Sequence, residues 1–355
     1  MIGRTSLAES AAESVTSPQA ISADHLNTVM LETLEGALTR SRGCPVRIIQ
    51  LDRTECQHKS TFHGEHLFAR LEDGESLRVF LKDLSPQHQI EQARKVRRSD
   101  APASNQELRV YQTILSKLAL GTPELHASRW DVERGIYWMF LEDTGSSRLR
   151  DCRNFVRWVP AAQWAARFHA ATRNLPASQT NFLPSYDAAH FRRYAANIQN
   201  ILPDLESKDR QLIDLAYSHF ESRIDWLNGL SRSVIHGQFF GKNIMLRPKT
   251  HKHHIAVIDW ETAALGPSSF DLVSVSSGRW TIRERESMWR AYFDQYQAET
   301  GLALNWDSFC LELREMELYQ ALEWLAWWRN RSVSHNFGKW VKELGRIVKT
   351  HPAMA

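Results

Sequence analysis

Two polar segments on either side of a short apolar hairpin contain residue types that bind a divalent cation. The first runs from His236 to Asn243 and includes Gln238, and the second is Asp259-Trp260-Glu261. Residues 244–246 and 255–258 between them predict two strands, and the connection is too short for a parallel crossover. The strands are therefore expected to be antiparallel, which places Asn243 and Asp259 at the same end of the hairpin.

An amide oxygen beside a carboxylate is a hard ligand pair that suits Mg²⁺, which takes a few protein oxygens and completes its shell with phosphate oxygens or water. For either residue alone, the simpler interpretation is that Asn243 caps a turn and Asp259 is a solvated strand end. The spacing of the whole run favours a metal site.

The order of these motifs resembles the aminoglycoside phosphotransferase and choline kinase-like family. The resemblance rests on His236-Gly237-x5-Asn243, on Ile258-Asp259-Trp260-Glu261, and on Gly266-Pro267-x3-Asp271-Leu272. Phe168-His169-Ala170 is similar to the Leu-His-Ala helix of that family, and the resemblance covers roughly residues 45–345. It implies the α+β, bilobal protein-kinase-like fold, with a small strand-rich N-lobe and a larger helical C-lobe.

The same resemblance implies roles for individual residues, with ATP (or another NTP) and Mg²⁺ as cofactors. Asn243 and Asp259 would bind the metal, and Lys82 would pair with the nucleotide phosphates, as phosphoryl transfer requires. Glu107 would hold Lys82 in a salt bridge, although Ser104-x-x-Glu107 also has the spacing of a capping box. Lys82 has its own alternative as an exposed strand lysine.

Further roles concern the adenine and the catalytic loop. Glu142 and the backbone to Thr144 occupy the place of the family's hinge, where adenine pairs with main-chain groups. Asp271 is expected to be a structural anchor that accepts backbone donors near the catalytic loop.

Gln238 stands where the family has its catalytic aspartate. An amide cannot accept a proton near neutral pH, and loss of a general base typically costs ~10²–10⁴ in rate. A neutral glutamine can still orient a nucleophile, and Glu261 can serve as the base instead. His236, Gln238 and Glu261 are therefore the catalytic candidates.

Three functions follow from these alternatives. The first is an ATP/Mg-dependent phosphotransferase acting on a small hydroxyl- or amine-bearing molecule. The second is a nucleotide-binding pseudokinase that acts as a scaffold or regulator. The third is nucleotidyl transfer on the same fold.

The remaining pattern supplies the elements that position these residues. A helix is predicted over residues 23–39, and strands over 47–51, 67–71, 76–84 and 136–141. In 76–84, Leu77, Val79 and Leu81 alternate with Lys82 on the opposite face. The later chain predicts helices over 158–171, 188–200, 209–227, 282–300 and 306–329.

The change from strands to helices predicts the domain organisation. Residues 1–22 are expected to be a flexible arm, 23–143 a nucleotide-binding N-lobe, and 144–355 a C-lobe with the catalytic loop and the acceptor-binding helices. In the last predicted helix, a leucine stripe faces one side and Trp324, Trp327 and Trp328 the other, which indicates either a buried helix or an aromatic wall for an acceptor. Glu312, Glu315, Glu317 and Glu323 would suit an amine-bearing acceptor.

Composition restricts the class of protein. The 355 residues are 43% hydrophobic and 24% charged, as in ordinary globular chains. A net charge of +3 is too small to indicate nucleic-acid binding. No signal peptide or apolar run of membrane-spanning length is evident, and the four cysteines are scattered. We therefore expect a cytoplasmic protein with a small-molecule acceptor, no nucleic-acid partner and no membrane partner; the oligomeric state is left open.

Overall fold

The computed structural model describes residues 23–57, 62–86, 105–248, 251–329 and 334–354. Its chain divides into two compact units. The first contains the described residues up to 86 together with Leu125–Asp143, and the second contains the described part of Ser104–Glu124 and of Thr144–Ala355. The predicted arm, residues 1–22, lies outside the described residues.

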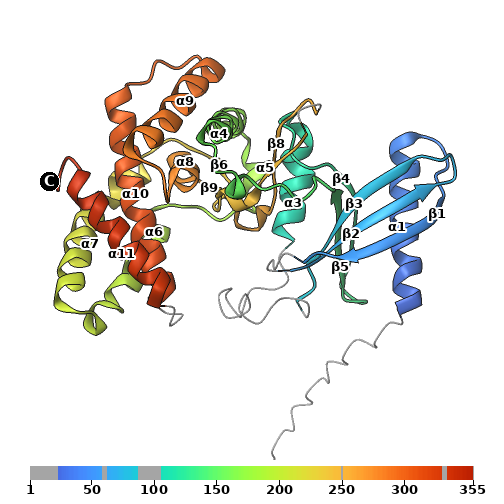
Figure 1. Ribbon diagram of the computed structural model, residues 1–355, viewed down its shortest axis with the longest axis horizontal. Helices are drawn as coiled ribbons and strands as arrows, with labels where there is room; N and C mark the ends of the chain where they lie inside the picture. The colour runs from blue at the N-terminus through green and yellow to red at the C-terminus, as the bar shows by residue number, and fades with distance from the viewer. Residues whose placement is uncertain (1–22, 58–61, 87–104, 249–250, 330–333, 355) are drawn as a thin grey trace, which may run out of the picture. The chain divides into compact units, whose positions relative to one another are not determined.

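The first unit is a five-stranded antiparallel sheet with one helix on its face (Figure 1). The strand order is β1-β2-β3-β5-β4. The elements are α1 (Ala23–Arg42), β1 (Ile48–Glu55), β2 (His63–Leu71), β3 (Ser76–Asp83), β4 (Leu125–Asp131) and β5 (Ile136–Glu142).

Alternation along β3 determines the two faces of this sheet. Val79 and Leu81 are buried in a core that also contains Met30 and Leu34 of α1. Lys82 is buried as well, and it lies on the opposite face because successive side chains of a strand alternate. Apolar burial against α1 therefore fixes the direction in which Lys82 points.

The helix α3 (Gln106–Thr113) groups with the second unit. The Gln106 side-chain amide donates to the backbone oxygens of Glu261 (3.2 Å) and Ala263 (2.8 Å). The helix N-cap is Asn105, without a side-chain cap, and Ser104 of the predicted capping box lies outside the described residues. The Glu107 carboxylate accepts the Trp260 amide at 3.2 Å. The assignment of 23–143 and 144–355 as functional lobes stays a prediction.

The second unit is mainly helical (Figure 1). After α3, its α-helices are α4 (Val159–Thr172), α5 (Ala177–Thr180), α6 (Ala188–Gln199), α7 (Ser207–Asn228), α8 (Ser269–Ser276), α9 (Ile282–Thr300), α10 (Trp306–Arg329) and α11 (Ser334–Thr350). Two ribbons form small antiparallel sheets: β6 (Arg232–Ile235) with β9 (Ala264–Pro267), and β7 (Ile244–Leu246) with β8 (Ile255–Val257). The short 3₁₀ segments are η2 (Leu115–Lys117), η3 (Leu149–Asp151), η4 (Phe155–Arg157), η5 (Leu202–Asp204), η6 (Gly241–Asn243) and η7 (Trp260–Thr262).

The predicted α+β fold class is confirmed, and α9 and α10 have the predicted bounds. The ends of α9 show why its pattern was readable: Thr281 and Glu284 form a capping box, and Gly301 ends the helix with φ +68°. In the described part of the chain, no helix is both long and apolar enough to cross a membrane.

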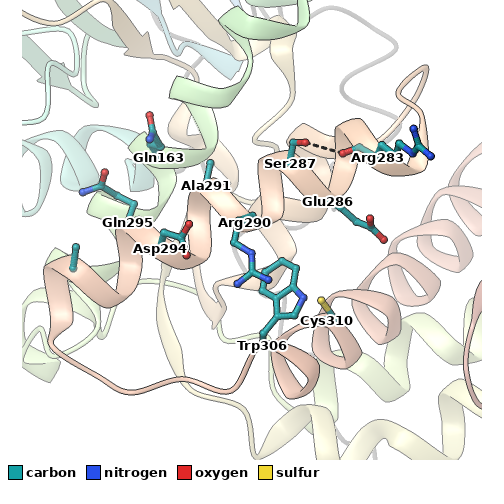
Figure 2. Close-up of a pocket in the computed structure, with 11 residues that line it drawn as sticks. Gln163, Arg283, Glu286, Ser287, Arg290, Ala291, Asp294, Gln295, Trp306 and Cys310 are labelled. Atoms are coloured by element: carbon teal, nitrogen blue, oxygen red, sulfur yellow. Dashed lines mark hydrogen bonds between the residues drawn. The ribbon is translucent and has the colours of Figure 1, made fainter.

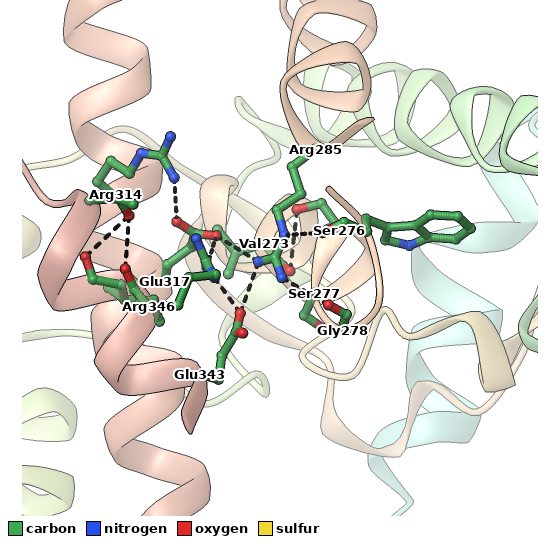
Figure 3. A network of polar contacts seen from close by, with 12 residues as sticks. Val273, Ser276, Ser277, Gly278, Arg285, Arg314, Glu317, Glu343 and Arg346 are labelled. Carbon is green, nitrogen blue, oxygen red and sulfur yellow. Dashed lines mark hydrogen bonds and ion pairs between the residues drawn. The ribbon is translucent and has the colours of Figure 1, made fainter. Parts of the chain in front are cut away.

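A buried ionic network joins α9, α10 and α11 (Figure 3). Arg285 contacts Glu317 at 3.0 Å and Glu343 at 2.9 Å. Arg314 and Arg346 each contact Glu317 at 3.0 Å. A buried charge is costly unless it is paired, so helix arrangements that separate these partners are disfavoured. The net contribution of the pairs to stability is small.

Candidate active site

The β7–β8 hairpin brings the two polar segments together as the sequence predicted. Ile244 pairs with Val257 and Leu246 with Ile255, in antiparallel register. The Ile258 amide donates to the Asn243 carbonyl at 3.0 Å. Asn243 therefore lies directly opposite the residue that precedes Asp259.

The Asn243 side chain is fixed by its own loop. Its Nδ2 donates to the Gln238 carbonyl at 3.0 Å, and the residue is buried. This bond assigns the amide orientation and leaves the oxygen Oδ1 as the atom that can coordinate a cation.

Asp259 begins the second polar segment with an unusual backbone. Its φ of +69° makes it the sole non-glycine residue with positive φ among those described. Such strain is typical of functional positions, where the surrounding structure enforces it. Carboxylate oxygens of Asp259, Glu261 and Glu107 lie within 4.8 Å of one another, which is a donor set that suits a hard divalent cation.

Asp271, on α8, anchors the loop from His236 to Asn243, which is the candidate catalytic loop. Its carboxylate accepts the amides of His236 (2.6 Å) and Gly237 (3.0 Å), and it contacts Nε2 of His169 at 3.1 Å. It is 1% exposed. Asp271 thus has the anchoring contacts that were expected from its motif.

Gly237 allows the tight turn of the loop. Its φ is +79°, and a Cβ at this position would collide with the Thr262 carbonyl. The Thr262 hydroxyl in turn donates to the His236 carbonyl at 3.0 Å. Any side chain at 237 would therefore separate the catalytic loop from the segment that follows Asp259.

Both ring nitrogens of His236 are engaged with backbone. Nε2 lies 2.9 Å from the Ile258 carbonyl, and Nδ1 accepts the Gln238 amide at 3.2 Å. Burial lowers the pKa of His236, so the ring is neutral near pH 7. Its geometry suits positioning of the loop better than proton transfer.

Gln238 is half-buried, and its Oε1 accepts Nζ of Lys242 at 3.2 Å. Glu261 is half-buried too, and it belongs to the carboxylate group with Asp259. Gln238 and Glu261 therefore lie on the two polar segments that the β7–β8 hairpin brings together.

In the first unit, Lys82 lies in the middle of the sheet. It pairs with Gly64 of β2 and Met139 of β5, and only 6% of it is exposed. The alternative of an exposed strand lysine is thereby wrong. Its Nζ is 5.7 Å from the centre of the Phe62 ring. Its pairing with Glu107 stays a prediction.

The predicted hinge begins where β5 ends, at Glu142, and Thr144 follows two residues later. Between them, Asp143 contacts His66 at 3.0 Å and Arg78 at 3.3 Å. No pattern near Asp143 in the sequence indicates these contacts, because its partners lie on β2 and β3. Adenine contacts at Glu142 and Thr144 stay a prediction.

Four partly exposed aromatic side chains form what we call the aromatic wall: Phe240, Trp324, Trp327 and Trp340. Phe240 belongs to the catalytic loop and contacts Trp324 of α10 with ring centres 5.7 Å apart. Trp324 is stacked on Trp340 of α11 at 5.8 Å and contacts Trp327 at 6.1 Å. Trp328 is outside the side chains described.

The four glutamates of α10, which were expected to suit an amine-bearing acceptor, are either paired with basic side chains or have a raised pKa. Glu317 belongs to the ionic network, and Glu315 contacts His219 and Arg223. Burial raises the pKa of Glu312, and it raises that of Glu323 to about 8. They therefore give little support to recognition of an amine through charge.

The raised pKa of Glu323 predicts a pH-dependent stability. The folded protein keeps this carboxyl protonated to about pH 8, whereas the unfolded chain releases the proton near its ordinary pKa of 4.5. The wild type should therefore lose stability as pH rises from about 4.5 to 8. In Glu323→Gln, denaturant unfolding at pH 5 and pH 8 should show that loss reduced by roughly 2–4 kcal/mol. The control Glu133→Gln, at an exposed position, should show the same loss of stability between pH 5 and pH 8 as the wild type. Equal losses of stability in the two variants would contradict the raised pKa of Glu323.

A separate surface groove of about 930 Å³ lies along α9 (Figure 2). It is lined by residues that include Gln163, Arg290, Asp294, Trp306 and Cys310, and Arg290 stacks over Trp306 at 3.5 Å. None of the predicted site residues lines it, so it takes no part in the candidate active site.

Comparison with known proteins shows the family of this chain. The sequence model of the phosphotransferase enzyme family (APH) matches residues 66–308. No curated protein sequence matches the chain significantly.

Solved structures share its fold. A spectinomycin phosphotransferase, APH(9)-Ia, in complex with ADP and spectinomycin is 14% identical over 94% of this chain and 99% of its own, with a TM-score of 0.56. Aminoglycoside 2'-phosphotransferase-IIIa in its GDP complex is 11% identical (91% and 97%, TM-score 0.56). The macrolide 2'-phosphotransferase MphH from Brachybacterium faecium is 14% identical (88% and 98%, TM-score 0.53). With its motifs and kinase-like fold, the chain belongs to the phosphotransferase enzyme family.

Proposed function

We propose that this protein is an ATP- and Mg²⁺-dependent phosphotransferase that acts on a hydroxyl group of a small molecule. The proposal rests mainly on one observation. In the hairpin the Asn243 backbone carbonyl accepts the amide of Ile258, which directly precedes Asp259, and carboxylate oxygens of Asp259, Glu261 and Glu107 lie within 4.8 Å of one another. ADP and GDP in the related structures support the use of a nucleotide.

The donor set fits the implied metal, since carboxylate and amide oxygens are the ligands that Mg²⁺ takes from protein. Asn243 and Asp259 would hold the ion, which neutralises charge on the transferred phosphoryl group when it is bound. Lys82 supplies the second positive charge to the phosphates. Its burial in the sheet gives that ammonium a fixed direction.

Gln238 takes the place of a general base, and we assign it an orienting role. Its amide oxygen accepts from Lys242, and the second lone pair of that oxygen can accept from a hydroxyl. Because the transition state of phosphoryl transfer is loose, an acceptor hydroxyl that is only oriented can still attack, at a lower rate than with a general base. Glu261 is the remaining candidate for the base, and His236 positions the loop.

The aromatic wall suggests the class of acceptor. Phe240 is only two residues from Gln238, and its contact with Trp324 extends an apolar surface away from the catalytic loop. Aromatic faces bind planar, apolar or cationic groups. We therefore propose a hydroxyl-bearing acceptor that also carries a ring or another apolar face.

Product analysis tests this function against its alternatives. The protein is incubated with Mg-ATP and a panel of aminocyclitol, macrolide and aromatic alcohols. Phosphotransfer gives ADP and a phosphorylated acceptor. AMP on an acceptor with released pyrophosphate would mean nucleotidyl transfer. Binding of Mg-ATP without any product would favour the pseudokinase. The observation that supports this alternative is the glutamine at 238, where the family has its catalytic aspartate.

The substitution Gln238→Asp should raise turnover by at least about tenfold. A carboxylate can accept the proton that an amide cannot, and a general base is typically worth 10²–10⁴ in rate. The measurement is steady-state ADP formation, with Gln238→Ala as the matched variant that has neither function. A lower rate in Gln238→Asp than in the wild type would mean that the neutral amide is itself required.

A further inference from the structure

A second group of metal-ligating side chains lies away from the candidate active site, among α7, α10 and the end of the chain. Its members are His219 in α7, Glu315 in α10 and His351, which follows α11. These helices pack side by side within the second unit (Figure 1). Three parts of the chain that are far apart in sequence therefore each contribute one potential metal ligand to the same point.

The two histidines aim at the same carboxylate oxygen. Nε2 of His219 lies 3.0 Å from Oε2 of Glu315, and Nε2 of His351 lies 3.7 Å from that atom. Two ligand atoms on one tetrahedral Zn²⁺, each about 2.0–2.1 Å from the ion, are about 3.3–3.4 Å apart. The two observed separations lie on either side of that value.

The group is buried, and it is poorly satisfied by the protein alone. His351 is 0% exposed and Glu315 2%. Nε2 of His351 has no hydrogen-bond partner among the described residues, although buried polar atoms nearly always have one. An ion pair of Glu315 with His219 would leave this nitrogen unsatisfied, whereas a shared cation would satisfy it.

The other carboxylate oxygen of Glu315, Oε1, lies 3.2 Å from Nε2 of His219 and is also held by an arginine outside the group. Nε of Arg223, one turn along α7 from His219, contacts Oε1 at 3.0 Å. This bond leaves Oε2 directed at the histidines, as second-shell donors orient ligating carboxylates in metal sites. Nδ1 of His351 accepts the Ala353 amide at 3.3 Å. Coordination through Nε2 would release that amide, which belongs to an exposed residue and can bond to water.

We propose that His219, Glu315 and His351 form a site for Zn²⁺ that ties the end of the chain to α7 and α10. Two imidazoles and one carboxylate suit zinc rather than magnesium, which prefers oxygen ligands. Water completes the fourth position. This site shares no residue with the candidate active site and does not depend on the proposed function.

The test compares the chelator-treated full-length protein with and without Zn²⁺. Wild type should bind one equivalent that His351→Gln and His219→Gln lack, as measured by equilibrium dialysis and metal analysis. Zn²⁺ at about 100 times its dissociation constant should raise the wild-type melting temperature by roughly 5 °C or more, and Mg²⁺ should not. Co²⁺ should give the visible absorption of a tetrahedral site in wild type but not in His351→Gln or His219→Gln.

The matched control is His251→Gln, since His251 lies in a histidine-rich turn where its Nδ1 contacts the backbone of His253. It should keep the zinc equivalent, as should Asp259→Asn in the candidate active site. Equal zinc binding by wild type and His351→Gln, or no zinc-dependent rise in melting temperature, would overturn the proposal. Loss of the equivalent in His251→Gln would place the ion in the turn instead.

Discussion

Replacing Asp259 with asparagine is expected to lower phosphoryl transfer by at least about 10²–10³-fold while the protein stays folded. The substitution removes the one negative charge that the proposal gives to the metal, in a site where charge on the transferred group must be neutralised. Asparagine is a better test than alanine because residue 259 has φ +69°, which asparagine tolerates more readily than other residues. The measurement is the rate of ADP formation at saturating Mg-ATP.

The control for this variant is Asp294→Asn, an exposed aspartate of α9 that lines the separate groove. It makes the same chemical change and should leave turnover unaltered. Thermal unfolding of Asp259→Asn should match the wild type to within a few degrees. Unchanged turnover in a folded Asp259→Asn protein would refute the assigned metal site and the proposed mechanism with it.

The second large effect is expected at Asp271, where asparagine should destabilise the protein by about 3–5 kcal/mol. The carboxylate accepts the amides of His236 and Gly237 and contacts His169, all in a buried place. Asparagine keeps one acceptor oxygen and turns an NH₂ group toward donors, so at least one buried donor loses its partner. Denaturant unfolding followed by tryptophan fluorescence measures the loss.

Turnover of Asp271→Asn should fall as well, measured at a temperature where the variant is folded. The loop from His236 to Asn243 would lose its anchor, and a small displacement of positioning residues is costly in rate. Asp294→Asn again provides the baseline for stability. If Asp271→Asn unfolds at the wild-type denaturant concentration and keeps its turnover, the anchoring role is wrong.

Much of the site could be predicted from the sequence because its residues lie close together along the chain. The turn between β7 and β8 forces an antiparallel pair, so the placement of Asn243 opposite the Asp259 segment follows from local chemistry. The direction of Lys82 follows from alternation along β3. The bounds of α9 follow from its capping box and its terminal glycine.

Elements that lack their own pattern were missed. β4 is half-buried along nearly its whole length, so it shows no alternation. α8 consists largely of serine and β-branched residues, which are poor helix formers, and tertiary burial overrides that preference. α11 contains Gly338 and Gly345, which weaken a helical pattern, and Trp340 was missed with it.

The amino-acid sequence by itself determined the hairpin, the order of the motifs and the two faces of the five-stranded sheet, since these depend on neighbours a few residues apart. Tertiary structure alone decided that Glu107 receives the Trp260 amide, that Phe240 meets Trp324 and that His219, Glu315 and His351 converge. Those contacts join residues that are tens to more than a hundred positions apart. Helix packing chooses such partners, and no periodicity along the chain encodes the choice.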